Sequence, residues 1–349
     1  MACAGLSGAG GQVWEWDLPA WVPPPVVPAD NPMTPAKVEL GRHLFHDQRL
    51  SADGSLSCAS CHHQSKAFTD GLATAAGVTG ERGTRSAMGL ANVAYLPTLT
   101  WANPQMTSLE VQALIPLFGE HPVEMGMAGR ESELFGLLQT DSTYRELFAR
   151  AFPAEARQGS EVLYSLSTLT KALASFQRSL VSFDSPYDRY RYGGQPDAIS
   201  ASARRGEELF FGEKLECYHC HGSFNFTDNI QHSRLPIAER GFHNTGLYDV
   251  DGLGSYPADN PGIVEFTGED SDRGRFRTPS LRNVAVTAPY MHDGSLTTLD
   301  QVIRQHYAIA GRSSAFRGQP SHMRSELLVG FEVTDAEVAD LVAFLESLT

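Results

Sequence analysis

Positive charge is scarce in this 349-residue sequence. Lys and Arg together number 27 against 41 Asp and Glu, which gives a formal net charge of −14. Nucleic-acid binding depends on concentrated positive charge that neutralises phosphates, and no cluster of Lys or Arg is present. The sequence therefore predicts that the chain does not bind nucleic acid.

Long apolar runs are also missing. No stretch approaches the roughly 18 apolar residues that a membrane span needs, so no span is expected. The first residues, 1–5, lack the basic segment and apolar core of a secretory signal. The same residues, with Cys3 among them, resemble the end of a lipoprotein signal, and the alternative is a thiol with no role.

Cysteine is sparse, and its five positions are too few to act as disulfide staples in a chain of this size. Four of the five form two Cys-x-x-Cys-His motifs, at 58–62 and 217–221. Two thiols at this spacing add across the vinyl groups of a porphyrin, and the histidine that follows becomes an iron ligand. Each motif therefore predicts one covalently bound c-type haem, so the chain should carry two.

Zinc and thioredoxin-like chemistry explain these motifs less well. Paired Cys-x-x-Cys zinc sites usually lie about 12 to 20 residues apart, whereas Cys61 and Cys217 are far apart in the chain. A thioredoxin-type site does not need the adjacent histidine.

Because c-type haem is attached outside the bacterial cytosol, the motifs predict a periplasmic protein whose leader has been trimmed. A lipid anchor at Cys3 is the alternative to a thiol with no role.

An internal repeat surrounds the two motifs. Gly41 to Phe45 and Phe68 to Asp70 flank the first, and Gly206 to Phe210 and Phe226 to Asp228 flank the second. Repetition on this scale indicates two copies of one small haem-binding unit. The fold class that we expect is mainly α, with two cytochrome c-like haem domains, long loops and little strand. The predicted boundaries are an extended arm at 1–33, a first domain at 34–190 and a second at 191–349.

Several local signals place the helices. Thr34 and Pro35 form a helix start that should run through Phe45, and Thr334 opens a capping box before the last helix. Either Ser200 or Ser202 caps the helix of the second repeat. The other expected elements are helices over 108–118, 130–151 and 160–182, a turn-rich linker over 185–200 and long loops between 222 and 280.

The first haem has few candidates for a ligand on its distal face. His63 is adjacent to the proximal His62 and cannot cross the porphyrin, and the next histidine is His121. Met88 and Met106 are alternatives that fit better as core residues. An iron with one open face can bind peroxide, so we expect this haem to be five-coordinate.

The segment 109–126 is a candidate cover for that open face. Gln112 and Pro116 are four residues apart and share a helical face, and Glu124 follows on a turn. A carboxyl group above an open haem could move a proton between peroxide oxygens during O–O cleavage. The alternative for Glu124 is a solvated loop acid.

The second haem has more candidates for its second ligand. With His221 as the proximal ligand, the candidates are Met291, His292, His306 and Tyr307. Bare ligand chemistry prefers methionine or histidine, whereas a tyrosinate would lower the potential and favour high-valent iron.

These features together resemble the bacterial di-haem cytochrome c peroxidase and MauG superfamily, over most of the chain from about Pro35. The finer features are similar to the methanobactin-associated, MbnH-type enzymes. The motifs that carry the resemblance are the two CxxCH sites, residues 14–19, 30–34, 100–104, 116–120, 185–190, 242–246 and 277–294.

The resemblance implies roles for particular residues. Trp101 would lie between the haems and carry charge by hole hopping, and Gln112, Pro116 and Glu124 would line the distal pocket of the first haem. Peroxide would oxidise the haem pair to a bis-Fe(IV) state. MauG-type enzymes use that state to oxidise a tryptophan of a partner protein, and MbnH-type enzymes convert a partner tryptophan to kynurenine, which helps that partner bind copper.

The sequence departs from the family pattern in places. The switchable histidine that peroxidases carry after the first CxxCH is missing, which favours the always-open, MauG-like form. Counting from Pro289 puts the peroxidase methionine position at His306, with Tyr307 one residue on; the chemistry of MauG favours Tyr307, and His306 is the rival. The resemblance also implies a calcium ion held partly by backbone oxygens of Thr287 and Pro289, but Ser86 stands where the usual asparagine would be.

Three functions follow from these observations. The first is a MauG-like enzyme that uses hydrogen peroxide to oxidise a tryptophan, to kynurenine, in a partner protein, with a periplasmic copper-binding protein as the expected partner. The second is a cytochrome c peroxidase that takes electrons from a small donor protein. The third is a di-haem electron carrier. The missing switch histidine counts against the second, and the shortage of distal ligands counts against the third.

Overall fold

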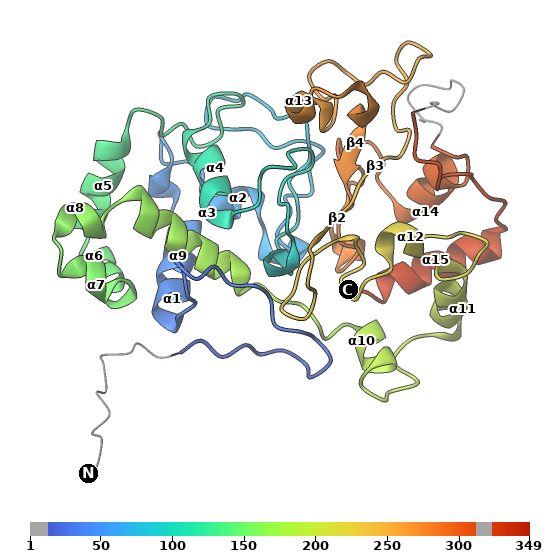
Figure 1. The fold of residues 1–349 in the computed structure, drawn as a ribbon, viewed down its shortest axis with the longest axis horizontal. Coiled ribbons are helices and arrows are strands. Elements are labelled where there is room, and N and C mark those ends of the chain that lie inside the picture. The colour runs from blue at the N-terminus through green and yellow to red at the C-terminus, as the bar shows by residue number, and fades with distance from the viewer. Residues whose placement is uncertain (1–12, 312–322) are drawn as a thin grey trace.

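The computed structural model describes residues 13–311 and 323–349, so Cys3 lies outside the described residues. As predicted, these residues are mainly helical, and their strands are few and short (Figure 1). β1 (Asn229–Ile230) pairs with β2 (Glu239–Arg240), and β3 (Phe242–Asn244) pairs with β4 (Arg275–Arg277), both antiparallel.

Helices from the first half of the chain pack together at one end of the molecule (Figure 1). α1 (Pro35–His46) contacts α9 (Leu166–Arg178) and α6 (Ser142–Ala151), and leucine and phenylalanine side chains of these helices form the largest buried cluster. The remaining helices of this half are α2 (Cys58–Cys61), α3 (Leu109–Gln112), α4 (Leu114–Phe118), α5 (Glu131–Thr140), α7 (Pro153–Ala156), α8 (Ser160–Leu163) and the 3-10 turns Gln48–Leu50, Gln64–Lys66 and Val93–Tyr95.

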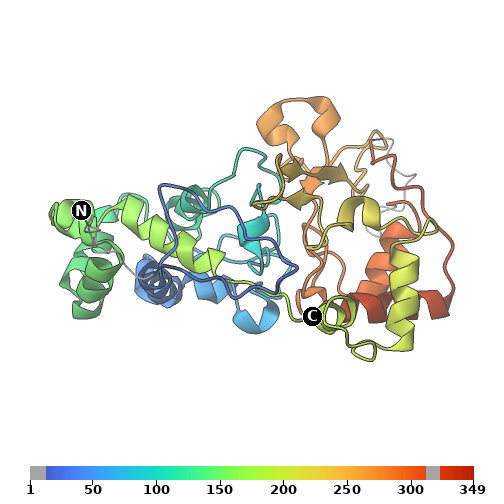
Figure 2. The same cartoon turned by 60° about the horizontal axis from the view of Figure 1, so that its bottom comes forward.

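A second group of helices lies at the other end, and Figure 2 shows coil filling much of the space between the two groups. α11 (Ala201–Phe210) packs against α15 (Asp335–Glu346). The other elements here are α10 (Pro186–Arg191), α12 (Tyr218–His221), α13 (Val264–Thr267), α14 (Leu299–Val302), the π-turn Ile303–Tyr307 and the 3-10 turns Asp270–Asp272 and Val284–Val286.

The predicted helix starts are confirmed by their caps. Thr34 accepts the backbone N–H of Lys37 at 3.2 Å, and Thr334 forms a capping box with Glu337. Ser200 caps α11 by accepting the N–H of Ala203 at 3.0 Å. Ser202, the alternative cap, instead donates its hydroxyl to Asp340 in α15.

Three predicted segments were wrong in their extent, because local caps outweigh apolar periodicity. The segment 130–151 is two helices, since the Asp141 carboxylate accepts the N–H groups of Thr143 and Tyr144 and starts α6 there. The segment 160–182 breaks at the capping box of Ser165 and ends at Arg178. Part of the expected linker is α10, which Ser185 caps.

The repeated glycines let two helix pairs approach each other closely. A Cβ atom at Gly41 of α1 would lie 2.0 Å from the Ala172 carbonyl oxygen of α9. A Cβ atom at Gly206 of α11 would lie 2.0 Å from the Asp340 carbonyl oxygen of α15. The same close crossing is therefore built twice, and it explains why each repeat begins with glycine.

The arm at 13–33 contains no helix or strand and runs along the lower edge of the molecule in Figure 1. The Tyr95 hydroxyl donates to the Pro23 carbonyl at 2.9 Å, and the Ser233 N–H donates to the Pro24 carbonyl at 2.9 Å. Trp21 stacks on Tyr192 with ring centroids 3.9 Å apart. The arm thus contacts residues from both halves of the chain.

Two buried ion pairs hold segments that are distant in sequence. Arg282 donates to both carboxylate oxygens of Asp188 at 2.8 and 3.0 Å, and Arg178 donates to both oxygens of Glu110 at 2.8 Å. Burial alone would raise the pKa of Glu110, but the hydrogen bonds from Arg178 lower it to about 2. Because Glu110 lies in α3, this pair fixes the helix that carries Gln112.

The glycine crossing makes a stability prediction. Gly206→Ala forces a methyl group against the α15 backbone, so we expect the free energy of unfolding to fall by about 1–3 kcal/mol. Gly136→Ala in α5 is the control, because a Cβ there meets nothing within 4 Å and should leave stability unchanged or higher. Chemical denaturation of the haem-loaded protein measures both variants, and equal stability of Gly206→Ala and wild type would contradict the crossing.

The Glu110 pair makes a pH prediction. Its folded pKa of about 2 lies below the ordinary value of 4.5, so its stabilisation is complete above about pH 4.5 and is lost as the pH falls toward 2. Glu110→Gln should therefore lower stability at neutral pH and flatten the acid limb of a stability–pH profile. Glu133→Gln, which removes an exposed partner of Arg130, should leave the acid limb as it is in wild type.

Candidate functional site

The two CxxCH motifs adopt matching local geometry. In the first, Nδ1 of His62 donates to the carbonyl oxygen of Phe68 at 2.7 Å; in the second, Nδ1 of His221 donates to that of Phe226 at 2.8 Å. A carbonyl oxygen can only accept, so Nδ1 carries the proton in both rings and Nε2 keeps its lone pair. This is the tautomer that an Nε2-ligated iron requires.

Burial keeps both imidazoles neutral. It lowers the pKa of His62 and the pKa of His221, because a charged ring would lose its hydration. A neutral imidazole is the form that binds a metal.

The accepting phenylalanines have an unusual backbone conformation. Phe68 has φ of 65° and Phe226 has φ of 51°, in the left-handed region that side-chain-bearing residues seldom occupy. The turn therefore directs the carbonyl of each phenylalanine toward the histidine. The repeated Phe-Thr-Asp was visible in the sequence, but only the structure shows that its first residue orients the proximal ligand.

Pro116 and Glu124 come together beside the first motif. The Met125 N–H donates to the Pro116 carbonyl at 2.9 Å, and the Val78 N–H donates to the Glu124 carbonyl at 2.8 Å, so two hydrogen bonds hold this loop. Burial raises the pKa of Glu124. Burial, and then the nearby Glu124 carboxylate, raise the pKa of Cys61. Glu124 is therefore a half-buried acid near the haem-attachment thiols, and the alternative of a fully solvated loop acid is wrong.

Gln112 lies one turn before Pro116. It ends α3, and Ala113 continues in helical conformation into α4, so the i and i+4 relation between Gln112 and Pro116 holds.

The two methionines considered as distal ligands make other contacts. Met106 is buried in an apolar cluster, and the Met88 sulfur accepts from Nη2 of Arg277 at 2.9 Å.

A cavity of about 410 Å³ adjoins the second motif. Cys217, Cys220 and His221 line it together with Tyr307, and His306 is absent from its lining. His306 is 1% exposed and turned into the protein. The structure thus brings Tyr307 into the same cavity as the proximal histidine and leaves the rival His306 outside it.

Both rival residues, His306 and Tyr307, lie in a π-turn. Residues Ile303–Tyr307 follow α14 as a π-turn, in which the Ala308 N–H donates to the Ile303 carbonyl five residues back at 2.8 Å. A regular α-helix bonds four residues back, so the π-turn changes the direction of the side chains that follow. The sequence has no signal for this turn.

The lining of this cavity fits a haem. Arg277 lines it, is 3% exposed, and donates to the carbonyl oxygen of Thr100 at 3.2 Å and to the Met88 sulfur, without a carboxylate bond among the described residues. Burial lowers the pKa of Arg277 to about 9. A buried guanidinium in this position suits a haem propionate, whose charge would compensate it.

Trp101 also lines this cavity. Its indole Nε1 donates to the Ser86 carbonyl at 2.9 Å, and its own carbonyl accepts the Arg277 N–H at 2.8 Å. The cavity lining also includes Ala67 and Thr69, which follow the first CxxCH motif. Trp101 therefore shares this cavity with residues of the second motif and with residues that follow the first.

The proposed calcium ligands lie on the same cavity. Thr287, Pro289 and Ser86 all line it, and the Ser86 N–H donates to the His292 carbonyl at 2.8 Å. The calcium site stays a prediction.

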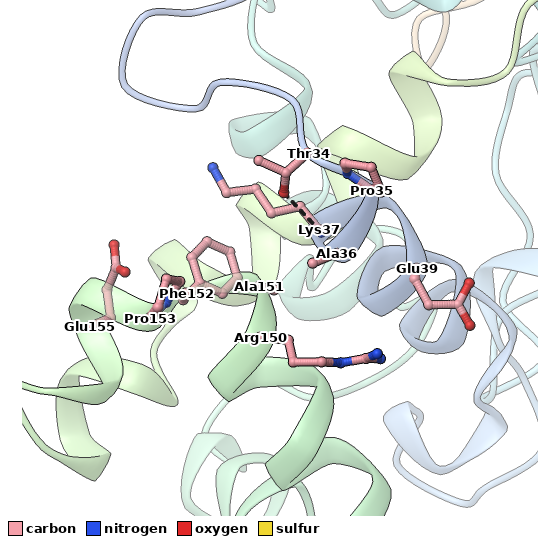
Figure 3. A pocket seen from close by; sticks show the side chains of 10 residues that line it. All are labelled: Thr34, Pro35, Ala36, Lys37, Glu39, Arg150, Ala151, Phe152, Pro153 and Glu155. Atoms are coloured by element: carbon pink, nitrogen blue, oxygen red, sulfur yellow. Dashed lines mark hydrogen bonds between the residues drawn. The ribbon is translucent and has the colours of Figure 1, made fainter. Parts of the chain in front are cut away.

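Two further features are a group of polar side chains next to the second motif and a surface hollow at the start of α1. Cys220, Asp228 and His243 are grouped as metal ligands would be, and the hydrogen bond to Asp228 raises the pKa of His243 to about 10. Since Cys220 belongs to a CxxCH motif, whose sulfurs are expected to bind haem, we interpret this group instead as a charged His–Asp pair. A separate surface hollow of about 510 Å³ lies between the start of α1 and the end of α6, lined by the side chains of Figure 3. It holds no cysteine or histidine.

None of the helices in the described ranges is long and apolar enough to cross a membrane.

Comparison with known proteins supports one family. A family model described as di-haem cytochrome c peroxidase matches residues 35–196. The methylamine utilization protein MauG of Methylorubrum extorquens is 37% identical over 324 residues, covering 92% of this chain and 80% of that protein. The cytochrome-c peroxidase IdrP1 of Denitromonas iodatirespirans is 34% identical, covering 94% of this chain and 85% of that protein.

Solved structures agree with these relatives. The crystal structure of a MauG-like protein associated with microbial copper homeostasis is 48% identical, with a TM-score of 0.90 and coverage of 96% of this chain and 95% of that one. The di-haem peroxidase BthA from Burkholderia thailandensis shares the fold at 23% identity and a TM-score of 0.71, covering 91% of this chain and 87% of that one. With two CxxCH sites in matching geometry and relatives along almost its whole length, the chain is an enzyme of the di-haem cytochrome c peroxidase and MauG family.

Proposed function

We propose that this protein uses hydrogen peroxide to oxidise a tryptophan of a partner protein to kynurenine, and that the partner is a periplasmic copper-binding protein. The observation that carries this proposal is the position of Tyr307, which shares the second haem cavity with His221. A tyrosinate ligand favours oxidised iron, which suits an enzyme that stores oxidising equivalents. The 48% identity to a MauG-like protein associated with copper homeostasis supports the choice of partner.

Named residues would hold the two haems. Cys58 and Cys61 would form thioether bonds to the first haem and Cys217 and Cys220 to the second, while His62, His221 and Tyr307 would be the protein ligands to iron. When bound, the haem pair supplies the peroxide chemistry and stores the two oxidising equivalents of one peroxide molecule. The rest of the reaction depends on side chains that position peroxide, protons and electrons. Covalent haem also implies a periplasmic location.

Glu124 is the proton-handling group of the first pocket in this proposal. Its raised pKa lets the carboxyl group hold a proton more readily than a solvated acid does, and pass it to a leaving oxygen. Gln112 and Pro116 would line the same pocket, where the proline limits access of water. The anchored loop keeps the carboxyl group in place.

Trp101 is the electron carrier between the two sites. Its N–H donates to a backbone carbonyl, which cannot act as a base, so the ring keeps its proton when it loses an electron. No proton then has to move when the ring regains its electron, so electron exchange between the two haem sites can be fast. A calcium ion at the backbone oxygens of Thr287 and Pro289 would stiffen the same region.

Mass spectrometry tests the proposed reaction. The haem-loaded protein is incubated with peroxide and candidate exported copper-binding proteins, and the peptides of each candidate are mapped. The expected result is one tryptophan that gains two oxygen atoms and then loses its formyl carbon. If the diferric protein reduces peroxide only after one-electron reduction by a donor and no tryptophan changes, the protein is a cytochrome c peroxidase instead. Absence of any reaction with peroxide would indicate an electron carrier.

Trp101→Phe tests the electron path. Both haems should stay bound, because covalent attachment is made by the cysteines and not by Trp101, but charge sharing between the haems should slow. Rapid-mixing absorption spectroscopy after peroxide addition measures this rate. Trp16→Phe is the matched control, since Trp16 contacts Trp14 on the N-terminal arm. Unchanged formation and decay in Trp101→Phe would remove Trp101 from the mechanism.

A further inference from the structure

A cluster of aromatic rings connects Trp101, which lines the cavity at the second motif, to two tyrosines that do not line it. The centroids of Trp101 and His292 are 6.4 Å apart, and those of His292 and Tyr248 are 6.2 Å apart. Tyr256 lies 5.5 Å from Tyr248, and Phe276 stacks on His292 at 3.6 Å. Tyr248 is therefore two ring contacts from Trp101, which lines the cavity at the second motif.

The two tyrosines of this cluster differ in what their hydroxyl groups meet. Tyr248 donates to the carboxylate oxygen Oδ2 of Asp293, whereas Tyr256 donates to the side-chain amide oxygen of Asn244 at 2.9 Å. A carboxylate can take a proton at the moment of oxidation, and an amide oxygen cannot. Burial lowers the pKa of His292 to about 3, so the neighbouring imidazole does not compete for that proton.

This difference decides which ring can be oxidised. A phenol that loses an electron becomes a strong acid, so its oxidation is feasible only where a base receives the proton. The Asp293 carboxylate is already hydrogen-bonded to the Tyr248 hydroxyl, and its other oxygen is held by the Ser295 N–H at 3.0 Å. The acceptor is thus oriented before the reaction begins.

We propose that Tyr248, with Asp293 as its base, is a redox-active relay through which oxidising equivalents leave the haem pair. Tyr248 gives one electron through His292 and Trp101 to the oxidised haem pair, which is reduced by one electron. The phenolic O–H bond breaks, and the proton moves to Asp293. The neutral tyrosyl radical then takes one electron from a tryptophan of the partner and recovers its proton from Asp293, and a second cycle uses the second equivalent. Because conversion of tryptophan to N-formylkynurenine removes four electrons, two peroxide molecules are consumed for each modified tryptophan.

The position of Tyr248 suits an exit from the protein. The ring is half-buried, so it contacts the cluster on one side and lies near the surface on the other. It opens a loop in which Val250 and Leu253 are exposed. The relay rests on the proposed function, because it needs a haem pair oxidised by peroxide.

Electron paramagnetic resonance after peroxide addition, without a partner, tests the relay. Wild type should show the spectrum of a tyrosyl radical. Labelling with ring-deuterated tyrosine should narrow the hyperfine structure of that spectrum relative to the unlabelled protein. Tyr248→Phe and Asp293→Asn should each lose that signal, and in both the oxidised haem absorption should decay several-fold more slowly. Tyr256→Phe is the matched control and should keep the signal. In deuterated water the decay of the oxidised haem absorption should slow in wild type and should not slow further in Asp293→Asn.

The possible outcomes separate the relay from the proposed function. If the wild-type haems oxidise with peroxide and Tyr248→Phe keeps the full radical signal, the relay is overturned while the peroxide chemistry stands. Loss of the signal in Tyr256→Phe with retention in Tyr248→Phe would overturn it as well. If peroxide does not oxidise the wild-type haems, the proposed function fails first and the relay fails with it. Haem absorption and thermal stability confirm that each variant is folded.

Discussion

The hydrogen bond from each proximal histidine to a phenylalanine carbonyl is the interaction on which both haem sites depend. It fixes the tautomer of His62 and of His221 and leaves the opposite nitrogen free for iron. To make it, Phe68 and Phe226 both adopt left-handed backbone, a conformation that costs about 1–2 kcal/mol for an ordinary residue. That two copies of the repeat share this cost indicates that ligand orientation, rather than local stability, shapes these turns.

Two residues that line the cavity at the second motif, Trp101 and Arg277, differ in charge and in their hydrogen-bond partners. Trp101 meets a backbone carbonyl, while Arg277 keeps its charge in a buried position that lacks a protein carboxylate among the described residues. A neutral hydrogen-bond partner suits a ring that passes electrons without moving a proton, and an unpaired guanidinium suits a cofactor that brings its own negative charge. Tyr248, by contrast, donates to the Asp293 carboxylate, which is the arrangement that the proposed relay requires.

Much of the fold follows from local signals. The caps at Thr34, Ser200 and Thr334 correctly marked helix starts, because a side-chain oxygen that satisfies a free N–H acts within three residues. Helix extents were harder to predict. Asp141 and Ser165 interrupt stretches whose apolar spacing continues past them, since a cap ends one helix and starts another whatever the periodicity of the surrounding residues.

The sequence by itself determined the mainly helical class and the two CxxCH motifs from which the haem sites and their proximal histidines are predicted, because covalent attachment and capping require particular residues at short, fixed spacing. Only the tertiary structure decided which of two adjacent residues faces the second haem cavity, since a π-turn that no residue pattern announces redirects Tyr307 and buries His306. The tertiary structure also decided that the loop with Glu124 packs beside Pro116, and that the Tyr248 hydroxyl donates a hydrogen bond to Asp293. Tyr248 and Asp293 are 45 residues apart in the chain, so packing rather than sequence spacing sets the distance between them.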